Sequence, residues 1–405
     1  MKIIADLHIH SRFSRATSPS INVKNISEFA KLRGLNLIGS GDFTHPSWLK
    51  ELKEFLEPGE GIFSYNDCNF VLSTEVSNIY SQGGKLRKIH TVLLAPSFEI
   101  VEQINELLAK KGKLEADGRP IFGSYSCYEL VEDLKNISDD IEIIPAHVWT
   151  PWFGLLGSKS GFDSVEECFK EQSKHIYALE TGLSSDPEMN WRLSKLDKYT
   201  LVSNSDAHSL WPWRLGREAN IFDFKELTYK AVIKAIREKE GFIKTIEVNP
   251  SYGKYHFDGH RMCNVCLSPE ETKKVNGICP KCGKKITIGV LNRVEELADR
   301  PSGFKPKNAL PFKHIIPLSE LIAAIENTNI ATQRVWNIYH KLIKEFKNEF
   351  NILLNVEKEK LRKFCDEKLL QVILENRQGK IKIKPGFDGE YGKLILEGEK
   401  QEKLF

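Results

Sequence analysis

The chain has 405 residues, more than one ordinary hydrophobic core contains, so we expect two or three domains. With 41% hydrophobic and 28% charged residues, it has the composition of a folded globular protein and not of a disordered one. It has no run of eighteen apolar residues and no start typical of a signal peptide, which predicts a cytoplasmic protein. The net charge of +3 neither requires nor excludes a polyanionic partner.

Residues 1–240 alternate short apolar segments with amphipathic ones, a pattern that predicts strands and helices in turn. The expected strands are Lys2–Leu7, Leu35–Ser40, Phe70–Thr74, Ile89–Ala95, Ile141–Pro145, Ile176–Leu179 and Thr200–Ser203. The expected helices include Asn25–Arg33, Ser47–Leu56, Ile100–Ala109, Tyr128–Leu134 and Ser164–Glu171. This order predicts an α/β barrel of seven strands.

Histidines and carboxylates are placed at the ends of five of these strands. They are His8 and His10 after the first, Asp42 and His45 after the second, Glu75 at the end of the third, His147 after the fifth, and Asp206 and His208 after the seventh. The isolated His90 begins its strand, so it reaches the same rim only if the third and fourth strands form a hairpin through the loop at residues 77–87. In barrels of this kind the loops that follow the strands meet at one rim.

This donor set predicts a multi-metal hydrolytic centre. Neutral imidazoles and carboxylates suit Zn²⁺, Mn²⁺ or Fe²⁺, and a carboxylate can bridge two ions. Such ions lower the pKa of a bound water and offset the charge of a phosphate, which favours phosphoester hydrolysis. Any single histidine is more simply a hydrogen-bonded core or surface group, but nine residues in this placement favour the metal centre.

A second domain, residues 241–300, contains a C-x2-C-x12-C-x2-C series. Its thiols, Cys263, Cys266, Cys279 and Cys282, predict a closed tetrahedral site for one structural zinc ion, whose role is folding. The other cysteines, Cys68, Cys127, Cys168 and Cys365, stand alone and are interpreted as buried thiols.

Basic and aromatic residues around these cysteines favour a nucleic-acid partner. Residues 251–290 hold seven Lys or Arg against three Asp or Glu, interleaved with aromatic rings. The alternative is a solvated surface around a zinc site. Further rings and cations follow the proposed ligands in the barrel loops, where they could contact a duplex. The predicted DNA contacts are Arg12, Phe13, Arg15, Arg87, Lys88, Trp149, Trp152, Trp213, Arg214, Tyr252, Lys254, Tyr255 and Arg261.

A third part, residues 301–405, begins with an extended Pro-containing connector and continues into a small helical bundle. The expected helices are Leu318–Asn327, Thr332–Phe346 and Val356–Asn376, followed by a hairpin or docking strand within Gly379–Gly398. The terminus Gln401–Phe405 resembles the beginning of a sliding-clamp-binding peptide. It lacks that peptide's distal aromatic pair, so a frayed end is the simpler interpretation.

The motif series resembles that of polymerase-and-histidinol-phosphatase (PHP) domains, through Asp6–His10, Gly41–His45, Ser73–Glu75, His90, His147 and Ser205–His208. The resemblance implies a distorted seven-stranded barrel with two or three ions (Zn, Mn or Mg). One would take His8, His10, Glu75 and Asp206, a second Glu75, His90 and His147, and a third His45 and His208. Asp42 is the least secure ligand, because many members have Asp adjacent to His in this motif; it is as well placed to orient a ligand.

The order of barrel, four-Cys segment and helical segment is similar to that of the endonuclease Q family. That resemblance implies cleavage of double- or single-stranded DNA on the 5′ side of a deaminated base (uracil, hypoxanthine, xanthine) or an abasic site, leaving a 3′-hydroxyl and a 5′-phosphate. Glu75, His8 and Asp206 would be catalytic, and a flipped base would enter a pocket near Arg12, Phe13 and the loop at residues 149–152. Two alternatives remain: a phosphatase of small phosphate esters and a non-catalytic DNA-binding protein.

Overall fold

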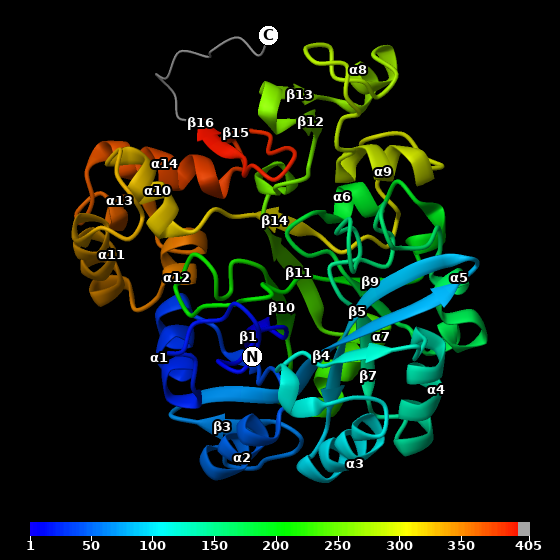
Figure 1. Cartoon of the computed structure of the whole chain (residues 1–405). Helices are drawn as coiled ribbons and strands as arrows, with labels where there is room; N and C mark the ends of the chain where they lie inside the picture. Colours follow the sequence, from blue (N-terminus) through cyan, green and yellow to red (C-terminus); the bar gives the residue numbers. More distant parts are fainter. Residues whose placement is uncertain (396–405) are drawn as a thin grey trace.

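The computed structural model describes residues 1–395, which form three regions. In Figure 1 a sheet-containing barrel region lies in the lower part of the view, a small cysteine-containing region at the top, and a helical region on the left. The proposed clamp-binding terminus at residues 401–405 lies outside the described residues. Within residues 1–395, no helix is long and apolar enough to cross a membrane.

The barrel region is built around one curled, ten-stranded sheet that forms a half-barrel. Eight strands follow one another in the order β14-β11-β10-β1-β2-β4-β5-β7, and β3 and β6 each pair with β4. The strands are β1 (Lys2–Asp6), β2 (Leu37–Gly39), β3 (Phe63–Tyr65), β4 (Cys68–Gln82), β5 (Lys85–Ala95), β6 (Ile121–Gly123), β7 (Glu142–Pro145), β10 (Ala219–Asp223), β11 (Phe242–Glu247) and β14 (Phe312–His314).

All seven predicted strands are present, but they do not form a sheet of their own. The sixth and seventh, β8 (Ala178–Glu180) and β9 (Thr200–Val202), pair with each other in parallel and stand apart from the ten-stranded sheet of the described residues. The α/β class is therefore confirmed, whereas the exact seven-stranded barrel is not. The strands β10 and β11, which sequence periodicity did not single out, extend the sheet beyond β1 through antiparallel pairing.

The barrel region also contains helices, and side-chain caps fix where several of them begin. They are α1 (Val23–Arg33), α2 (Pro46–Phe55), α3 (Phe98–Ala109), α4 (Cys127–Ile137), α5 (Val165–Phe169), α6 (Pro187–Asn190) and α7 (Tyr229–Glu238). Ser97 caps α3, and Ser126 with Glu129 forms a capping box at the start of α4. The predicted helix at Ser164–Glu171 is shorter than expected, since it passes into a 3₁₀ turn at Lys170.

The hairpin on which His90 depended is present. β4 and β5 pair in antiparallel register from Leu72 with Ala95 to Gln82 with Lys85. The turn is Gly83-Gly84, whose φ values of 61° and 72° match the primed turns of two-residue hairpins. Most of the predicted loop is therefore strand, and Glu75 lies inside β4 instead of at its end, which corrects that expectation. His90 lies opposite Ser77 on the paired strand.

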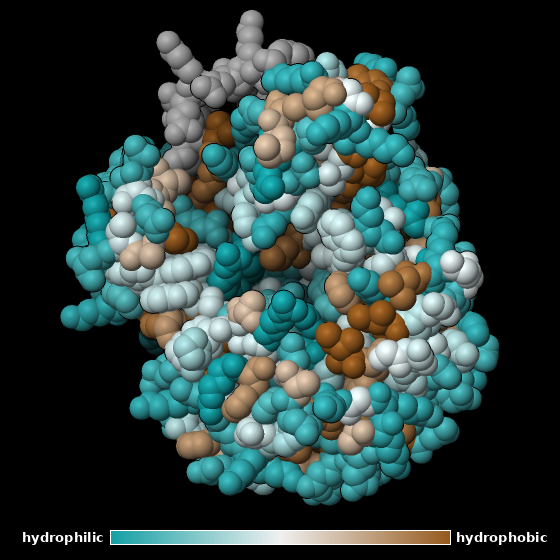
Figure 2. Space-filling model, viewed as in Figure 1, coloured by the Kyte–Doolittle hydropathy of each residue, from teal (hydrophilic) through white to brown (hydrophobic). Residues whose placement is uncertain are grey.

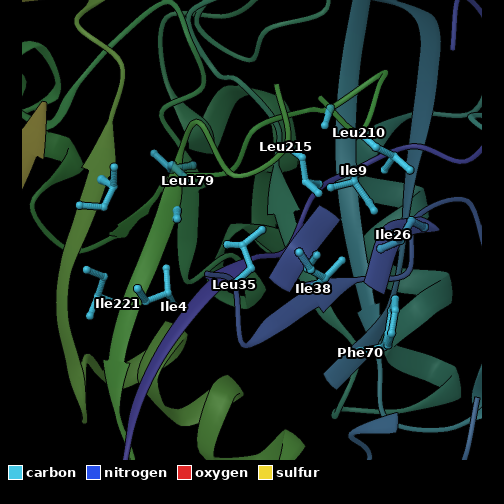
Figure 3. Close-up of a cluster of buried hydrophobic side chains, with 14 of the residues drawn as sticks. Ile4, Ile9, Ile26, Leu35, Ile38, Phe70, Leu179, Leu210, Leu215 and Ile221 are labelled. Carbon is cyan, nitrogen blue, oxygen red and sulfur yellow. The ribbon is translucent and has the colours of Figure 1, made fainter. Parts of the chain in front are cut away.

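A buried aliphatic cluster fixes the segments that carry the ligands. Figure 3 shows Ile9 beside Leu210 and Leu215. Ile9 follows β1 in the chain, and the two leucines follow β9. Each is at most 4% exposed, and burial of such a side chain contributes about 1.5–3 kcal/mol. The loop that contains Asp206 and His208 is thereby held against the core.

The helical region contains α10 (Leu318–Ile325), α11 (Gln333–Phe346), α12 (Glu349–Leu354), α13 (Lys358–Leu361) and α14 (Glu367–Arg377). One predicted helix, Val356–Asn376, is wrong as a single element, because Asp366 accepts a hydrogen bond from the N–H of Leu369 and starts a new helix. The predicted terminal hairpin is confirmed by the pairing of β15 (Lys382–Lys384) with β16 (Lys393–Ile395).

A buried ion pair joins the helical region to the barrel. Arg33 of α1 pairs with Glu349 of α12, and both side chains are fully buried. Glu349 also accepts hydrogen bonds from the hydroxyl of Tyr339 and the N–H of Leu318, at 2.9 and 2.7 Å. Arg33 in turn donates to the carbonyl of Gly216, at the end of the loop that carries Asp206.

The cysteine-containing region is small. It consists of the antiparallel pair β12 (Asp258–His260) and β13 (Val265–Leu267), followed by α8 (Pro269–Lys274) and α9 (Val290–Leu297). Its own hydrophobic cluster contains Val265, Cys279 and Ile286 as the fully buried members. A core of this size predicts that the region needs an additional cross-link to be stable.

Candidate metal centre

Two groups of donor atoms meet at the barrel rim, and Glu75 belongs to both. One group is His8, His10, Glu75 and Asp206, and the other is Glu75, His90 and His147. Within each group the donor atoms lie within 4.8 Å of one another, close enough to share one ion. These are the residues that the resemblance to PHP domains assigned to two of the three ions.

Short distances between the donors show how tightly the groups are assembled. Nε2 of His10 lies 3.0 Å from Oδ1 of Asp206 and 3.4 Å from Oε2 of Glu75. The other oxygen of Glu75 lies 2.8 Å from Nδ1 of His90 and 3.1 Å from Nε2 of His147. Oε1 also lies 3.8 Å from Nε2 of His8, so the carboxylate of Glu75 contacts both groups, as a bridging ligand requires.

Buried atoms without partners indicate that the donors fit divalent ions. Nε2 of His8, His10 and His90 and Oδ1 of Asp206 are buried and have no hydrogen-bond partner in the described part of the chain. Such atoms are costly to leave unpaired. An N/O donor set of this kind suits Zn²⁺ or Mn²⁺. Nε2 of His8 and of His10 lie 3.7 and 3.0 Å from Oδ1 of Asp206, whereas His90 faces Glu75 through Nδ1.

Strained backbone aims several of these side chains. Asp206 and His147 adopt positive φ values of 49° and 32°, a conformation that residues other than glycine rarely take. Asp42, next to the centre, also has a positive φ of 45°. Such strain is concentrated at functional sites and persists only where the surrounding structure enforces it.

Asp42 orients a ligand and does not belong to either donor group. Its Oδ1 lies 2.9 Å from Nδ1 of His10, and its Oδ2 accepts hydrogen bonds from the N–H and hydroxyl of Ser11, both at 2.6 Å. The contact leaves Nε2 of His10 for the centre. Asp42 was considered both as a ligand and as a residue that orients one, and its position in the structure fits the second role.

Glu180 plays the same part for His8, and sequence reasoning missed it. Its two oxygens lie 3.1 Å from Nδ1 of His8, and it accepts hydrogen bonds from the N–H of His147 at 2.9 Å and from Asn204 at 2.8 Å. Glu180 ends β8, so the strand-end rule that found the other ligands could have found it.

The charges of the centre are strongly coupled. Burial opposes the imidazolium of His8, but the carboxylates of Glu180, Glu75 and Asp206 outweigh it and raise its pKa to about 9. Burial lowers the pKa of His90 to about 4, although Glu75 opposes that shift. Burial would raise the pKa of Glu75, yet the neighbouring histidines hold it well below its usual value. Glu75 is therefore ionised, as a bridging ligand must be.

The residues predicted for a third ion lie close by but outside both groups. The ring of His45 stacks on Phe13 with centroids 4.2 Å apart. Nδ1 of His208 lies 2.9 Å from the backbone carbonyl of Asp206, and its ring lies 4.6 Å from that of His10. A third ion held by His45 and His208 stays a prediction.

The cysteine region gathers a separate group of four donors, which differs from the predicted set in one member. It consists of His260, Cys263, Cys279 and Cys282, and Sγ of Cys282 lies 3.4 Å from Nδ1 of His260. Cys266 lies on β13, opposite Gly259, and is not in this group. Burial opposes the thiolate of Cys279, but N–H groups of Lys281 and Cys282 point at its sulfur and lower its pKa to about 6. A thiol of this kind is a good zinc ligand at neutral pH.

The predicted DNA contacts fall into buried and exposed sets. Trp149 is fully buried and donates its indole N–H to Asn190 at 2.8 Å, so the expectation of a surface ring is wrong there. The guanidinium of Arg87 is also engaged, with the carbonyls of Gln82 and Gly161. Arg12 pairs with Glu51.

Trp152, by contrast, is 43% exposed and contacts Tyr255 with ring centroids 5.7 Å apart. All seven basic residues of residues 251–290 are exposed, Lys254 and Arg261 among them, as is Arg15 in the barrel. Figure 2 shows a mainly hydrophilic face with hydrophobic side chains gathered near its middle, between the upper and lower parts of the molecule. Lys88, half-buried, lies over Phe153, whose ring contacts His90.

The second tryptophan pair packs against the helical region. Trp211 and Trp213 stack with centroids 5.0 Å apart, and both contact Trp336 of α11. Trp213, Arg214 and Tyr252 line one cavity of about 400 Å³, which is large enough for a nucleobase. Three predicted DNA contacts from two regions therefore meet at one hollow.

Arg119 is a further residue of the centre that the sequence did not indicate. Its Nη1 lies 3.2 Å from Oε2 of Glu75. The parallel pairing of β6 with β4 brings this loop to Glu75, since the carbonyl of Pro120 accepts a hydrogen bond from the N–H of Ser77. No motif in the sequence marks such a contact.

Comparison with known proteins gave one family model, curated relatives and solved structures. Residues 317–380 match the model described as the MJ0043 C-terminal domain. The chain is 37% identical to the uncharacterized protein MJ0043 of Methanocaldococcus jannaschii over 259 residues. The aligned segment covers 63% of this chain and 32% of that protein. The chain thus spans about a third of the length of that relative.

Two solved structures match nearly the whole chain at 33% identity. One is the crystal structure of the lesion-specific endonuclease PfuEndoQ from Pyrococcus furiosus, with a TM-score of 0.88 and coverage of 98% of this chain and 96% of that one. The other is a crystal structure of Endonuclease Q in complex with a 27-mer duplex substrate that has an abasic lesion at the active site. Its TM-score is 0.87, and coverage is 100% of both chains.

Proposed function

The chain belongs to the endonuclease Q family, and on that premise we propose that it is a metal-dependent endonuclease that incises damaged DNA in repair. The observation that carries the proposal is the pair of donor groups that share Glu75, in a chain that matches endonuclease Q over its whole length. A phosphodiester is the substrate that such a centre suits best.

The donors fit two divalent ions, one held by His8, His10, Glu75 and Asp206 and one by Glu75, His90 and His147. When bound, the ions supply Lewis acidity, which activates water as a nucleophile and offsets the charge of the phosphate. Zn²⁺, Mn²⁺ and Mg²⁺ remain the candidates. One zinc ion in the cysteine region would cross-link a segment with a very small core.

The protein's own residues hold the reacting groups in place. Glu180 and Asp42 fix the rings of His8 and His10, so that their Nε2 atoms stay directed at the centre. Asp206 is the more exposed of the two carboxylates in the first group, at 30% against 0% for the Glu75 side chain. It is therefore the carboxylate placed to accept a proton from the attacking water and to orient that water.

The finer parts of the proposal concern the substrate. We expect cleavage 5′ to uracil, hypoxanthine, xanthine or an abasic site, in double- or single-stranded DNA, with a 3′-hydroxyl and a 5′-phosphate as products. Deaminated bases share a carbonyl where the normal base has an amine, which a buried donor can recognise. The exposed cations of the cysteine region and the exposed Trp152 support contact with the DNA backbone and bases.

An incision assay tests the proposal. Labelled duplexes with one uracil, one hypoxanthine, one abasic site or no lesion are incubated with the protein in Mg²⁺, Mn²⁺ or Zn²⁺. We expect one cut 5′ to each lesion and none in undamaged DNA. A ladder from undamaged DNA would indicate a general nuclease. Intact DNA beside rapid release of phosphate from a small ester would identify a phosphatase.

Two variants connect the assay to the centre. Asp206→Ala should abolish incision and retain binding to the duplex, because it removes a ligand and not a DNA contact. Asp67→Asn, which changes an exposed carboxylate outside both donor groups, is the matched control and should cut like the wild type. Equal rates for Asp206→Ala and the wild type would refute the assigned centre. Binding without incision by the wild type in all three metals would leave only a non-catalytic role.

A further inference from the structure

We propose that Arg119 is a catalytic residue that binds a non-bridging oxygen of the scissile phosphate. This inference rests on the proposed function, because it names a contact between the enzyme and the phosphodiester that it cuts. Its starting point is the single contact of the guanidinium: Nη1 lies 3.2 Å from Oε2 of Glu75, the residue common to both donor groups.

The main chain of Arg119 is held at the centre by contacts that do not involve Glu75. Its N–H donates to Asp117 at 3.1 Å, and the N–H of Gly118 donates to the carbonyl of Phe13, also at 3.1 Å. The hydroxyl of Thr44 donates to the carbonyl of Gly118 at 3.2 Å. A Cβ at Gly118 would lie only 2.4 Å from Oδ2 of Asp42, so the loop packs directly on the residue that orients His10. The backbone of Arg119 therefore stays beside the centre even if the guanidinium leaves Glu75.

The guanidinium has donors to spare. Nε of Arg119 is buried and has no hydrogen-bond partner within residues 1–395, and the side chain is 21% exposed. Arg33 provides the contrast, since its fully buried guanidinium pairs with Glu349 and donates through Nε and Nη2 to the carbonyl of Gly216. Arg33 is satisfied as a structural arginine is, whereas Arg119 keeps an open edge.

The positive charge expected at the centre indicates that the unpaired donors of the Arg119 guanidinium bind an anion. Both oxygens of Glu75 face donor groups suited to divalent ions, and a guanidinium beside them is repelled once those ions are bound. Glu75 supplies one negative charge between the guanidinium and the ions, and a further anion is needed to offset the rest of the positive charge. A phosphodiester supplies that anion, and its two non-bridging oxygens match the planar fork of arginine.

The alternative is that Arg119 serves only to position Glu75, and a cycle of binding measurements separates the two. The affinity of the Ca²⁺-loaded protein is measured for an abasic duplex with a normal phosphate 5′ to the lesion and for one with a neutral methylphosphonate at that phosphate. Both are measured with the wild type, Arg119→Met and Arg119→Lys. Arg362→Met, which removes an exposed arginine of the helical region, is the control.

If Arg119 binds the phosphate, Arg119→Met weakens binding of the normal duplex by roughly 10- to 100-fold and leaves the methylphosphonate duplex unchanged. Arg119→Lys should give a smaller loss, because it keeps the charge and loses the fork. Equal losses for both duplexes, or no loss for either, would overturn the proposal.

The proposed function can fail independently. If the wild type does not distinguish the abasic duplex from undamaged DNA, the function is wrong, and Arg119 is then tested on bis(4-nitrophenyl) phosphate, a diester without bases. A loss of hydrolysis with Arg119→Met at unchanged metal content supports the contact with phosphate. Wild-type hydrolysis by that variant overturns it.

Discussion

The substitution Glu180→Gln tests whether the carboxylate of Glu180, which does not contact the reacting groups, raises the affinity of the centre for metal. Glu180 contacts Nδ1 of His8 through both oxygens and accepts the N–H of His147. Glu180→Gln keeps the shape and one acceptor oxygen but removes the charge that raises the basicity of His8. Loss of such a partner typically lowers metal affinity or activity 10- to 100-fold, or about 1.4–2.7 kcal/mol.

The assay is a metal titration of the purified protein by calorimetry, with incision rates measured alongside. We expect the dissociation constant of the ion at His8 to rise 10- to 100-fold, while the midpoint of thermal unfolding without metal falls less than in Glu180→Ala, because one of the two acceptor oxygens is kept. Glu180→Ala should also destabilise the fold, since it leaves the N–H of His147 and the amide of Asn204 buried without an acceptor. Wild-type metal affinity in Glu180→Gln would refute the argument.

Two further predictions concern stability and a third concerns zinc binding. Glu349→Ala leaves Arg33 buried without its partner and should lower the free energy of unfolding by about 3–5 kcal/mol, measured by chemical denaturation. A loss below about 1 kcal/mol would contradict the importance of the buried pair. Burial raises the pKa of Glu142 to about 7, so ionisation of this side chain should destabilise the fold as pH rises from the unfolded pKa of about 4.5 through 7. Glu142→Gln avoids that cost, and its melting temperature should exceed that of the wild type by an amount that grows from pH 5 to pH 8; parallel pH profiles would count against it. Cys279→Ser should lose the bound zinc measured by elemental analysis, while Cys68→Ser, a buried thiol in the barrel, retains it; full zinc content in Cys279→Ser would exclude the thiolate as a ligand.

The members of the two donor groups could be predicted from the sequence because their chemistry follows the strand pattern. His8, His147 and Asp206 come directly after strands whose apolar periodicity is plain, and such positions converge on one rim. His90 reaches the rim only if the third and fourth predicted strands form a hairpin, and the sequence alone does not show whether they do. The pairing of β4 with β5 decides it.

Arg119 could not be predicted, because nothing local marks it. Its place depends on the pairing of the three-residue strand β6 with the middle of β4, more than forty residues away in the chain. Short strands carry too little periodicity to be recognised, and their partners less still. Glu180 is different, since it directly follows the predicted strand Ile176–Leu179, a position of the same kind as those of the other candidate ligands.

Trp149 shows where loop arguments fail. Its place in a loop next to His147 predicted an exposed ring, yet the ring of Trp149 is buried and its N–H donates a hydrogen bond to Asn190. A long loop can fold back on the barrel and form a core of its own, and sequence spacing contains no information about that packing. Trp152, three residues further on, remains exposed.

The most direct test of the central claim is the position of the cut in a duplex with a single abasic site. With Mg²⁺ or Mn²⁺, the wild-type protein should produce one labelled fragment that ends at the phosphate 5′ to the lesion, and the undamaged duplex should stay intact. The new end should be extendable by a polymerase, as a 3′-hydroxyl is. No incision at the lesion in either metal, or equal cutting of both duplexes, would contradict the assignment of this centre to lesion-specific cleavage.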